Sequence, residues 1–201
     1  MVLDQYREIE QATGVKMSGA HDADDMEVLQ AFLQGEVRGI PRVDSPNGFV
    51  GRLIEGTKPQ SFAELLQIIG LSHGTGIWND KLFAEHRLTL REIPVFAEDI
   101  YREIAEKLRA KGIFDTGFAL EAARKVRLGA YQKAGGMDEA HLHALLDLGL
   151  DLDWIFVLEN TMYSLPKAQC IGYLVDAKAL MWYKLNCPSE YAHIFVPHRG
   201  I

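Results

Sequence analysis

Hydrophobic residues recur at helical spacing along almost the whole chain, and glycine or proline separates one run from the next. The first amphipathic segment runs from Leu3 to Thr13 and is closed by Gly14, a residue suited to a helix C-terminus. No alternating run demands a sheet, although residues 88–95 suit either a strand or a turn. The pattern predicts an all-α protein, with further helices at residues 26–33, 79–86, 98–111, 115–129, 138–148, 152–163 and 166–186 and near residue 191.

Several of these helices begin at residues that cap helix N-termini. Ser61 and Glu64 have the spacing of a capping box, which predicts a helix from Ser61 onward. Ser45 and Pro46 predict another start, because proline is tolerated in the first helical turn. Residues 21–25 hold a histidine and three aspartates that could bind a metal ion. Because they stand where a helix N-terminus favours negative charge, capping is the preferred interpretation.

The segment from Gly70 to Trp78 interrupts the helical pattern with three glycines in seven residues. Glycine takes positive φ angles at little cost, so such a run allows sharp turns and the close approach of another molecule. Ser72, His73 and Thr75 add polar groups to this glycine turn. On local chemistry alone, the simpler interpretation is a helix C-terminus with a glycine cap and a buried Trp78.

Composition places the chain among ordinary globular proteins. Of its 201 residues, 48% are hydrophobic and 24% are charged, which suits one domain or two closely packed ones. The net charge of −7 argues against general coating of nucleic acid. Cys170 and Cys187 lie in apolar surroundings and favour packing roles in a reduced, cytoplasmic protein. We find no signal-peptide pattern near Met1 and no stretch apolar enough to span a membrane.

The adjacent Gly135 and Gly136 mark the clearest flexible break in the chain. They suggest an N-terminal helical part at residues 1–134, which holds the glycine turn and the basic helices, and a C-terminal helical part at residues 137–201. One continuous domain is the alternative.

Basic residues are concentrated between Tyr101 and Lys133, where eight Lys or Arg minus four Asp or Glu give a local charge of +4. This asymmetry fits a surface that faces phosphates, with Arg124, Lys125 and Arg127 as the candidate DNA-binding residues. Ordinary salt-linked helix faces are the alternative. On the first interpretation, primer-template DNA binds weakly, with strong salt dependence and no sequence preference.

No spacing in the sequence predicts a catalytic or metal site. A Ser-His-Asp order, a glycine-rich phosphate loop with lysine and a Cys/His metal spacing are all missing. His141 and His143 are two residues apart on a helix, so they point in different directions and are poor co-ligands. His193 and His198 flank a helix end and are expected to be solvated. His73 has the best claim to a role, yet a hydrogen bond to local backbone explains it almost as well.

Three groups of residues, which follow one another in the family's order, resemble one protein family. The glycine turn is the specific one, and the other two are residues 39–41 with residues 57–59 and Phe62, and residues 165–169 with Tyr173, Lys184, Pro188, Glu190 and Tyr191. Together they cover nearly the whole chain and resemble the PolC-type alpha subunit of DNA polymerase III. In that family this region is the fingers, which close on the incoming nucleotide and the template. The resemblance implies an irregular multi-helix assembly of that kind.

The resemblance also implies sites and partners. Ser72, His73, Gly74 and Lys167 are the expected contacts to the nucleotide and its phosphates, and a palm domain and primer-template DNA are the expected partners. In such polymerases, aspartates hold the divalent ions for nucleotidyl transfer. Those aspartates belong to the palm, upstream of the region matched here. We therefore expect no catalytic residue, no cofactor unless magnesium is supplied by a joined palm, and no polymerase activity from this chain alone.

Three departures from the family pattern remove polar groups. A family arginine is replaced by Ala97, a histidine by Gln169 and a second arginine by Ala179. Alanine cannot hold phosphate oxygens as a guanidinium does. Two interpretations follow: a fingers-type module that is cut from, or acts with, a PolC-like polymerase, and a stand-alone relative that serves as a non-catalytic helical DNA- or protein-interaction module.

Overall fold

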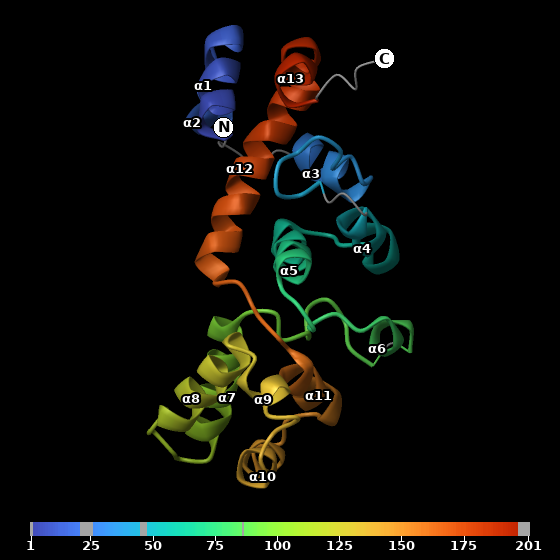
Figure 1. Cartoon of the computed structure of the whole chain (residues 1–201). Helices are drawn as coiled ribbons and strands as arrows, with labels where there is room; N and C mark the ends of the chain where they lie inside the picture. Colours follow the sequence, from blue (N-terminus) through green and yellow to red (C-terminus); the bar gives the residue numbers. More distant parts are fainter. Residues whose placement is uncertain (1, 21–25, 45–47, 86, 197–201) are drawn as a thin grey trace. The chain divides into compact units, whose positions relative to one another are not determined.

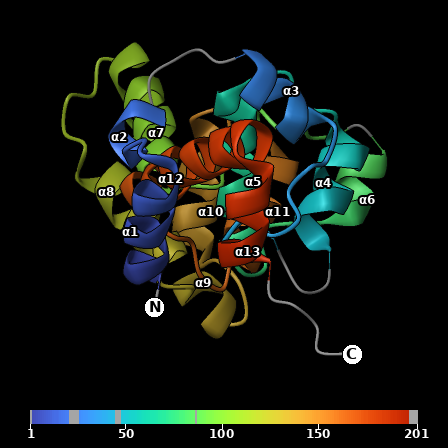
Figure 2. The same ribbon diagram turned by 90° about the horizontal axis from the view of Figure 1, so that it is seen from above.

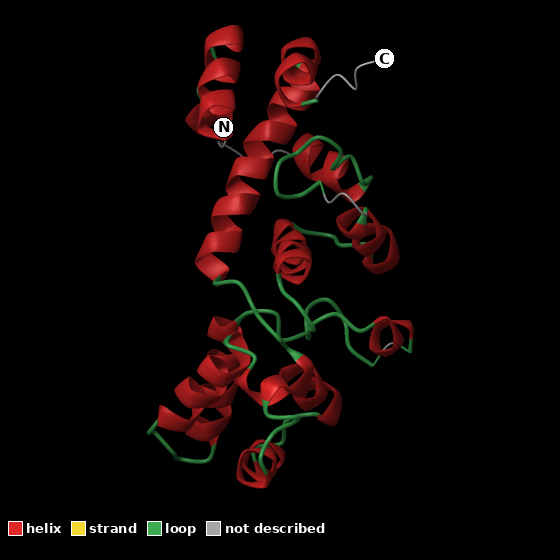
Figure 3. Cartoon of the chain, viewed as in Figure 1, coloured by secondary structure: helices red, strands yellow, loops and turns green. Residues whose placement is uncertain are grey.

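The computed structural model describes residues 2–20, 26–44, 48–85 and 87–196. All regular secondary structure in these ranges is helical (Figure 3), which confirms the all-α prediction. No helix within them is both long enough and apolar enough to cross a membrane. The expected caps at residues 21–25, the expected helix start at Ser45 and Pro46, and the side chains of His86 and His198 lie outside the described residues.

The chain forms two compact units. The first contains Met1–Ile69 and Ile171–Ile201, and the second contains Gly70–Cys170. The pair Gly135 and Gly136, where the sequence suggests a break, lies inside the second unit. The division into parts at residues 1–134 and 137–201 stays a prediction.

The first unit combines helices from both ends of the chain. Helix α1 lies beside α13 (Figure 2). The side-chain amide of Gln5 in α1 donates to the carbonyl oxygen of Ile194 in α13 at 3.0 Å. Ile9, Phe32 and Ile40 are among its fully buried residues. Its helices are α1 (Val2–Thr13), α2 (Met17–Ala20), α3 (Met26–Leu33), α4 (Phe49–Thr57), α5 (Phe62–His73) up to Ile69, α12 (Lys167–Asn186) from Ile171, and α13 (Pro188–Phe195).

Buried tyrosines tie distant segments of the first unit together. The hydroxyl of Tyr191 donates to the carbonyl oxygen of Gly39 at 2.9 Å. The hydroxyl of Tyr183 donates to the carbonyl oxygen of Val15 at 2.6 Å. Burial raises the pKa of Tyr183 to about 12, so its hydroxyl keeps the proton that it donates. The bond from Tyr191 joins two of the segments that carry the family resemblance. Both segments therefore contribute to the framework of this unit.

The second unit centres on a helical hairpin, in which α7 and α8 lie side by side (Figure 1). Apolar residues recur every fourth position on α7, at Ile100, Ile104 and Leu108, and meet small residues of α8 such as Ala119 and Ala123 in one buried core. The short alanine side chains let the two helices approach closely. The helices of this unit are α6 (Asp80–Ala84), α7 (Ala97–Ala110), α8 (Gly117–Arg127), α9 (Ala130–Lys133), α10 (Glu139–Asp147) and α11 (Leu152–Asn160).

The helix ends show which cap predictions hold. Ser61 Oγ accepts the backbone N–H of Glu64 at 3.3 Å, which confirms one half of the capping box. The Glu64 carboxylate accepts the N–H of Gln60, the residue before the cap. The described start of α4 is Phe49, and Gly48 precedes it with a φ of 66°. The short helices α2 and α9 were not predicted, because four residues are too few to show a period.

Candidate nucleic-acid interface

The glycine turn pairs with a segment far along the chain. The Thr75 N–H donates to the Tyr163 carbonyl oxygen at 2.9 Å, and the Thr75 carbonyl oxygen accepts the Met162 N–H at 2.8 Å. Because the residues after Asn160 are bonded to the turn, α11 ends there, before its predicted end at Tyr163. The structure thus brings the turn next to the residues that lead into the resembling segment 165–169.

The glycines of the turn lie against the protein's own chain. A Cβ atom on Gly70 would lie 2.4 Å from Cγ1 of Val95 and 2.6 Å from the ring of Phe96. A Cβ atom on Gly76 would lie 2.2 Å from the carbonyl oxygen of Asn160. Real Cβ atoms essentially never approach other atoms this closely. These two glycines are therefore required for internal packing, and α5 continues as a helix through Gly70.

The three candidate nucleotide-binding residues of the turn are half-buried at the end of α5. Ser72 and His73 form its last turn, and Gly74 follows, with its N–H bonded to the Gly70 carbonyl oxygen at 2.8 Å. The expected buried Trp78 is corrected, because Ile77 is only 1% exposed whereas Trp78 is half-buried and stacks on an aromatic ring of α6. A nucleotide contact by Ser72, His73 and Gly74 stays a prediction.

Lys167 is the first residue of α12, and its ammonium group forms an ion pair with a carboxylate of α7. Its Nζ atom lies 2.7 Å and 2.8 Å from the two carboxylate oxygens of Asp99, and its backbone N–H donates to Glu98 at 3.2 Å. Asp99 also pairs with Arg102 at 3.1 Å. The Asp99 side chain is only 17% exposed, so this pair is better shielded from water than a surface ion pair. A phosphate group would have to compete with Asp99 for Lys167.

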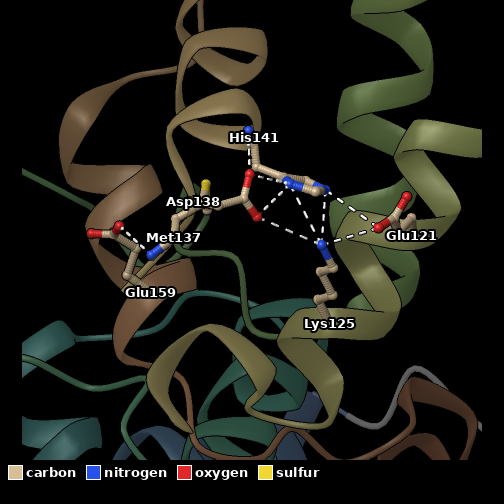
Figure 4. Close-up of polar contacts among 6 residues, drawn as sticks. All are labelled: Glu121, Lys125, Met137, Asp138, His141 and Glu159. Atoms are coloured by element: carbon tan, nitrogen blue, oxygen red, sulfur yellow. Dashed lines mark hydrogen bonds and ion pairs between the residues drawn. The ribbon is translucent and has the colours of Figure 1, made fainter. Parts of the chain in front are cut away.

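Lys125 belongs to a polar network between α8 and the start of α10 (Figure 4). Its Nζ atom lies 3.0 Å from Oε1 of Glu121, 3.7 Å from Oδ2 of Asp138 and 3.1 Å from Nε2 of His141. The network contains both signs of charge, which is the salt-linked alternative that the sequence left open for this residue. A DNA contact by Lys125 stays a prediction, and a phosphate would have to compete with these three partners.

His141, set aside as a metal ligand in the sequence, lies at the centre of this network. Its Nδ1 atom is 2.8 Å and 2.7 Å from the two carboxylate oxygens of Asp138, and its backbone N–H donates to Asp138 at 2.9 Å as part of the α10 N-cap. The bond from this backbone N–H, followed by that from the ring, lowers the pKa of Asp138 to about 2. The hydrogen bond from Lys125 lowers the pKa of Glu121 as well. Both carboxylates are therefore ionised at neutral pH.

The sequence predicts the two local parts of this network but not the contact between them. Glu121 and Lys125 have the i, i+4 spacing of a helical ion pair, and Asp138 has the position of an N-cap. The packing of α10 near α8 brings the Glu121–Lys125 pair into contact with Asp138 and His141. Next to the network, the N–H of Met137 donates to Glu159 at 3.0 Å (Figure 4), so the chain after the glycine pair is bonded to α11.

Arg124 and Arg127 are exposed on α8 and line a groove of about 600 Å³. Ala97 and Tyr101 of α7 line the same groove. Ala97 is the position at which the sequence resemblance implies a family arginine. Two arginines of α8 therefore line the groove beside that position. The sequence identified these arginines by charge, but it did not show that they share a groove with Ala97.

The remaining candidate groups lie away from these contacts or inside the fold. Cys170 is fully buried, and burial raises the pKa of its thiol to about 11, which suits a packing residue. Cys187 is half-buried. His193 is exposed, as expected, and His143 is exposed as well. Within the described ranges, no group of three or more His, Cys, Asp or Glu residues is arranged to hold a metal ion.

Comparisons with known proteins identify related sequences. The family model described as the bacterial DNA polymerase III alpha subunit finger domain matches residues 2–115. Relatives named DNA polymerase III PolC-type include that of Mycoplasma genitalium, 33% identical over 157 residues, which are 76% of this chain and 10% of that protein. The relative of Oceanobacillus iheyensis is 30% identical over 180 residues, 82% of this chain and 12% of that protein.

The relative of Streptococcus mutans is 28% identical over 185 residues, 84% of this chain and 12% of that protein. The chain thus spans about a tenth of the length of the curated relatives that it matches. The family model covers more than half of the chain, from α1 through the glycine turn to α7. The PolC-type relatives extend the similarity over most of the remaining residues. As the glycine turn and its companion segments predicted, the chain belongs to the finger domain family of the bacterial DNA polymerase III alpha subunit and is a PolC-like fingers module.

Proposed function

We propose that this fingers module contacts the phosphate backbone of primer-template DNA through Arg124 and Arg127, and that it acts with a palm domain. The observation that carries the proposal is the contrast among the predicted cations. Arg124 and Arg127 are exposed beside an open groove, whereas Lys125 and Lys167 lie within ion-pair distance of their own carboxylates. Arginine also suits phosphate better than lysine, because its planar guanidinium donates two parallel hydrogen bonds.

Magnesium belongs to the palm in this proposal. Two-metal catalysis needs carboxylates that converge on both ions. No such convergence of acidic or histidine side chains occurs in the part of the chain that the structure describes. In this proposal the palm supplies the carboxylates that hold the ions, and this chain contributes shape and cationic contacts.

Reversing both arginines tests the proposed contact. Arg124→Glu combined with Arg127→Glu is expected to weaken primer-template binding by at least about 150-fold, because each of the two charge-assisted phosphate contacts contributes about 1.5–3 kcal/mol. The salt dependence should change as well, since each lost contact lowers the slope of log K against log salt by about 0.9 for duplex DNA. Fluorescence anisotropy of labelled primer-template at several salt concentrations measures both quantities.

The matched control is Arg7→Glu combined with Arg38→Glu, which changes the net charge equally at two exposed arginines of the first unit. This variant should keep most of the affinity, because a contact site loses more than a general attraction does. Equal losses in both double variants would show that only net charge matters. Binding that ignores salt would remove the phosphate contact altogether.

Nucleotide binding by the chain alone is expected to be undetectable. Ala97 provides no cation, and Lys167 is paired with Asp99. Isothermal titration calorimetry with a deoxynucleoside triphosphate, with and without magnesium, should show no heat of binding at micromolar protein, and a primer-extension assay should show no product. Ala97→Arg is the informative variant, because a guanidinium there would join Arg124 and Arg127 at the groove; weak binding by this variant would fit the proposal. Tight binding or extension by the unaltered chain would contradict it.

Interaction with a protein is the second candidate function. Leu120 and Leu128 are 63% and 50% exposed and line the same groove as the arginines. Leu120→Gln combined with Leu128→Gln distinguishes the candidates, because a phosphate contact needs the arginines and a protein contact also needs the leucines. DNA affinity that survives the leucine changes and is lost on arginine reversal favours the first candidate.

A further inference from the structure

The protonation state of His141 decides which neighbours it can bond. In the neutral ring, Nδ1 carries the proton and donates to Asp138, because an ionised carboxylate can only accept. The other nitrogen, Nε2, then presents a lone pair. Lys125 Nζ lies 3.1 Å from Nε2 and 3.5 Å from Nδ1, so the ammonium faces the ring of His141, which attracts a cation while the ring is neutral. A neutral His141 and the Lys125 ammonium are therefore compatible partners.

A protonated His141 is not compatible with Lys125 at this distance. Its Nε2 atom would carry a hydrogen that Lys125 cannot accept, and two positive charges would face each other. Glu121 offers the alternative acceptor, because its Oε1 atom lies 3.5 Å from Nε2. The protonated ring would therefore keep Asp138, take Glu121 and compete with Lys125 for both carboxylates.

The other groups that face His141 do not offset this change. The ring of Phe118 stacks on it at 5.5 Å between centroids, and the ring of Tyr131 meets it edge-on at 5.8 Å. Burial raises the pKa of Tyr131, so this hydroxyl stays neutral. The charged groups around the ring are thus Glu121, Lys125 and Asp138. With His141 neutral these three sum to −1, and protonation of the ring brings the cluster to zero.

We propose that His141 is a proton-operated latch for Lys125: the neutral ring holds the ammonium in the network, and the protonated ring releases it as a third cation next to Arg124. The inference rests on the proposed phosphate contact of Arg124 and Arg127. Lys125 is suited to such a movement, because its side chain is 30% exposed and ends a flexible four-carbon stem. Acidification then raises the affinity for nucleic acid by adding one phosphate contact.

The salt dependence of primer-template binding tests the latch at about pH 7.5 and about pH 5.5, which bracket the usual titration of imidazole. For the unaltered chain, the slope of log K against log salt should steepen by about 0.9 at the lower pH, the value of one added phosphate contact. His141→Gln and Lys125→Gln should show no steepening. His143→Gln is the matched control, since His143 is exposed on the same helix, and it should steepen like the unaltered chain. Equal steepening in His141→Gln would overturn the proposal.

Nuclear magnetic resonance can detect the protonation of His141 and the release of Lys125 in the absence of DNA. The ring nitrogens of His141 should report the Nδ1–H tautomer in the neutral state, and the Lys125 Nζ signal should shift with the same midpoint as the His141 titration. His141→Gln should abolish that shift. A Lys125 signal that ignores the titration would refute the latch even if the arginines bind DNA. A coupled shift without any DNA binding would instead uphold the latch and refute the phosphate contact that we propose for Arg124 and Arg127.

Discussion

Replacing Gly76 with alanine is expected to lower the free energy of unfolding by about 3 kcal/mol or more. Gly76 has a φ of 77°, a left-handed conformation that costs alanine about 1–2 kcal/mol. The new Cβ atom would also lie 2.2 Å from the carbonyl oxygen of Asn160. That oxygen belongs to the backbone at the end of α11, so it cannot move away without disturbing the pairing of Thr75 with Met162 and Tyr163. Urea unfolding followed by circular dichroism measures the loss.

Gly112→Ala provides a matched control. Gly112 has the same φ of 77°, but nothing lies within 4 Å of a Cβ atom built on it. Its replacement should therefore cost only the conformational part, about 1–2 kcal/mol. The difference between the two variants isolates the contact with Asn160. Equal losses would show that Gly76 is required for its dihedral angle alone and not for the approach of α11.

Local pattern predicted most of the fold because helix starts and ends are encoded within a few residues. Gly14, Gly112 and Gly149 end helices as expected, each with a positive φ, and Asp138 caps α10. The end of α11 was predicted too late, because a partner distant in the sequence determines it. Thr75 binds the residues that would have formed the next helical turn, and no short window contains both partners.

The candidate site shows a sharper limit on prediction from sequence. Counting charges found the basic segment but treated its lysines and arginines alike. The structure separates them, because Lys125 lies among Glu121, Asp138 and His141 whereas Arg124 and Arg127 line a groove. Lys125 is adjacent in sequence to Arg124, but successive helical residues point about 100° apart. One of the two can therefore line the groove while the other lies in the ion-pair network.

The same distinction explains which resembling residues carry the fold. Gly70 and Gly76 pack against backbone or ring atoms of the protein, and Tyr191 bonds to Gly39. These positions hold the framework together whether or not a nucleotide binds. Ala97, where the resemblance implies a family arginine, is half-buried at the groove and does not carry the framework in this way. Similarity at framework positions therefore identifies the family, while the contacts that we propose for the exposed cations depend on surface positions that the framework does not fix.

Gly70→Ala is the second change with a large expected effect, and here the sign itself is informative. Gly70 lies inside α5, where alanine normally favours the helix by about 1 kcal/mol. The added methyl group would overlap Val95 and Phe96, which are 1% and 0% exposed and have little room to move. We expect a net loss of about 2 kcal/mol in the free energy of unfolding, the usual cost of overpacking a core. Gly51→Ala in α4 is the control, because nothing lies within 4 Å of its Cβ position and it should be neutral or stabilising.

A double-mutant cycle with Val95→Ala then tests the cause. Val95→Ala alone should cost about 2 kcal/mol, because it leaves a cavity in a buried site. Combined with Gly70→Ala, it removes the Cγ1 atom that lies 2.4 Å from the new methyl group, and the methyl group fills part of the cavity. The double variant should therefore be more stable than the sum of the two losses by about 1–2 kcal/mol, as measured by urea unfolding. Additive losses would mean that the strain at Gly70 comes from the ring of Phe96, and a stable Gly70→Ala variant would remove the packing explanation for this glycine.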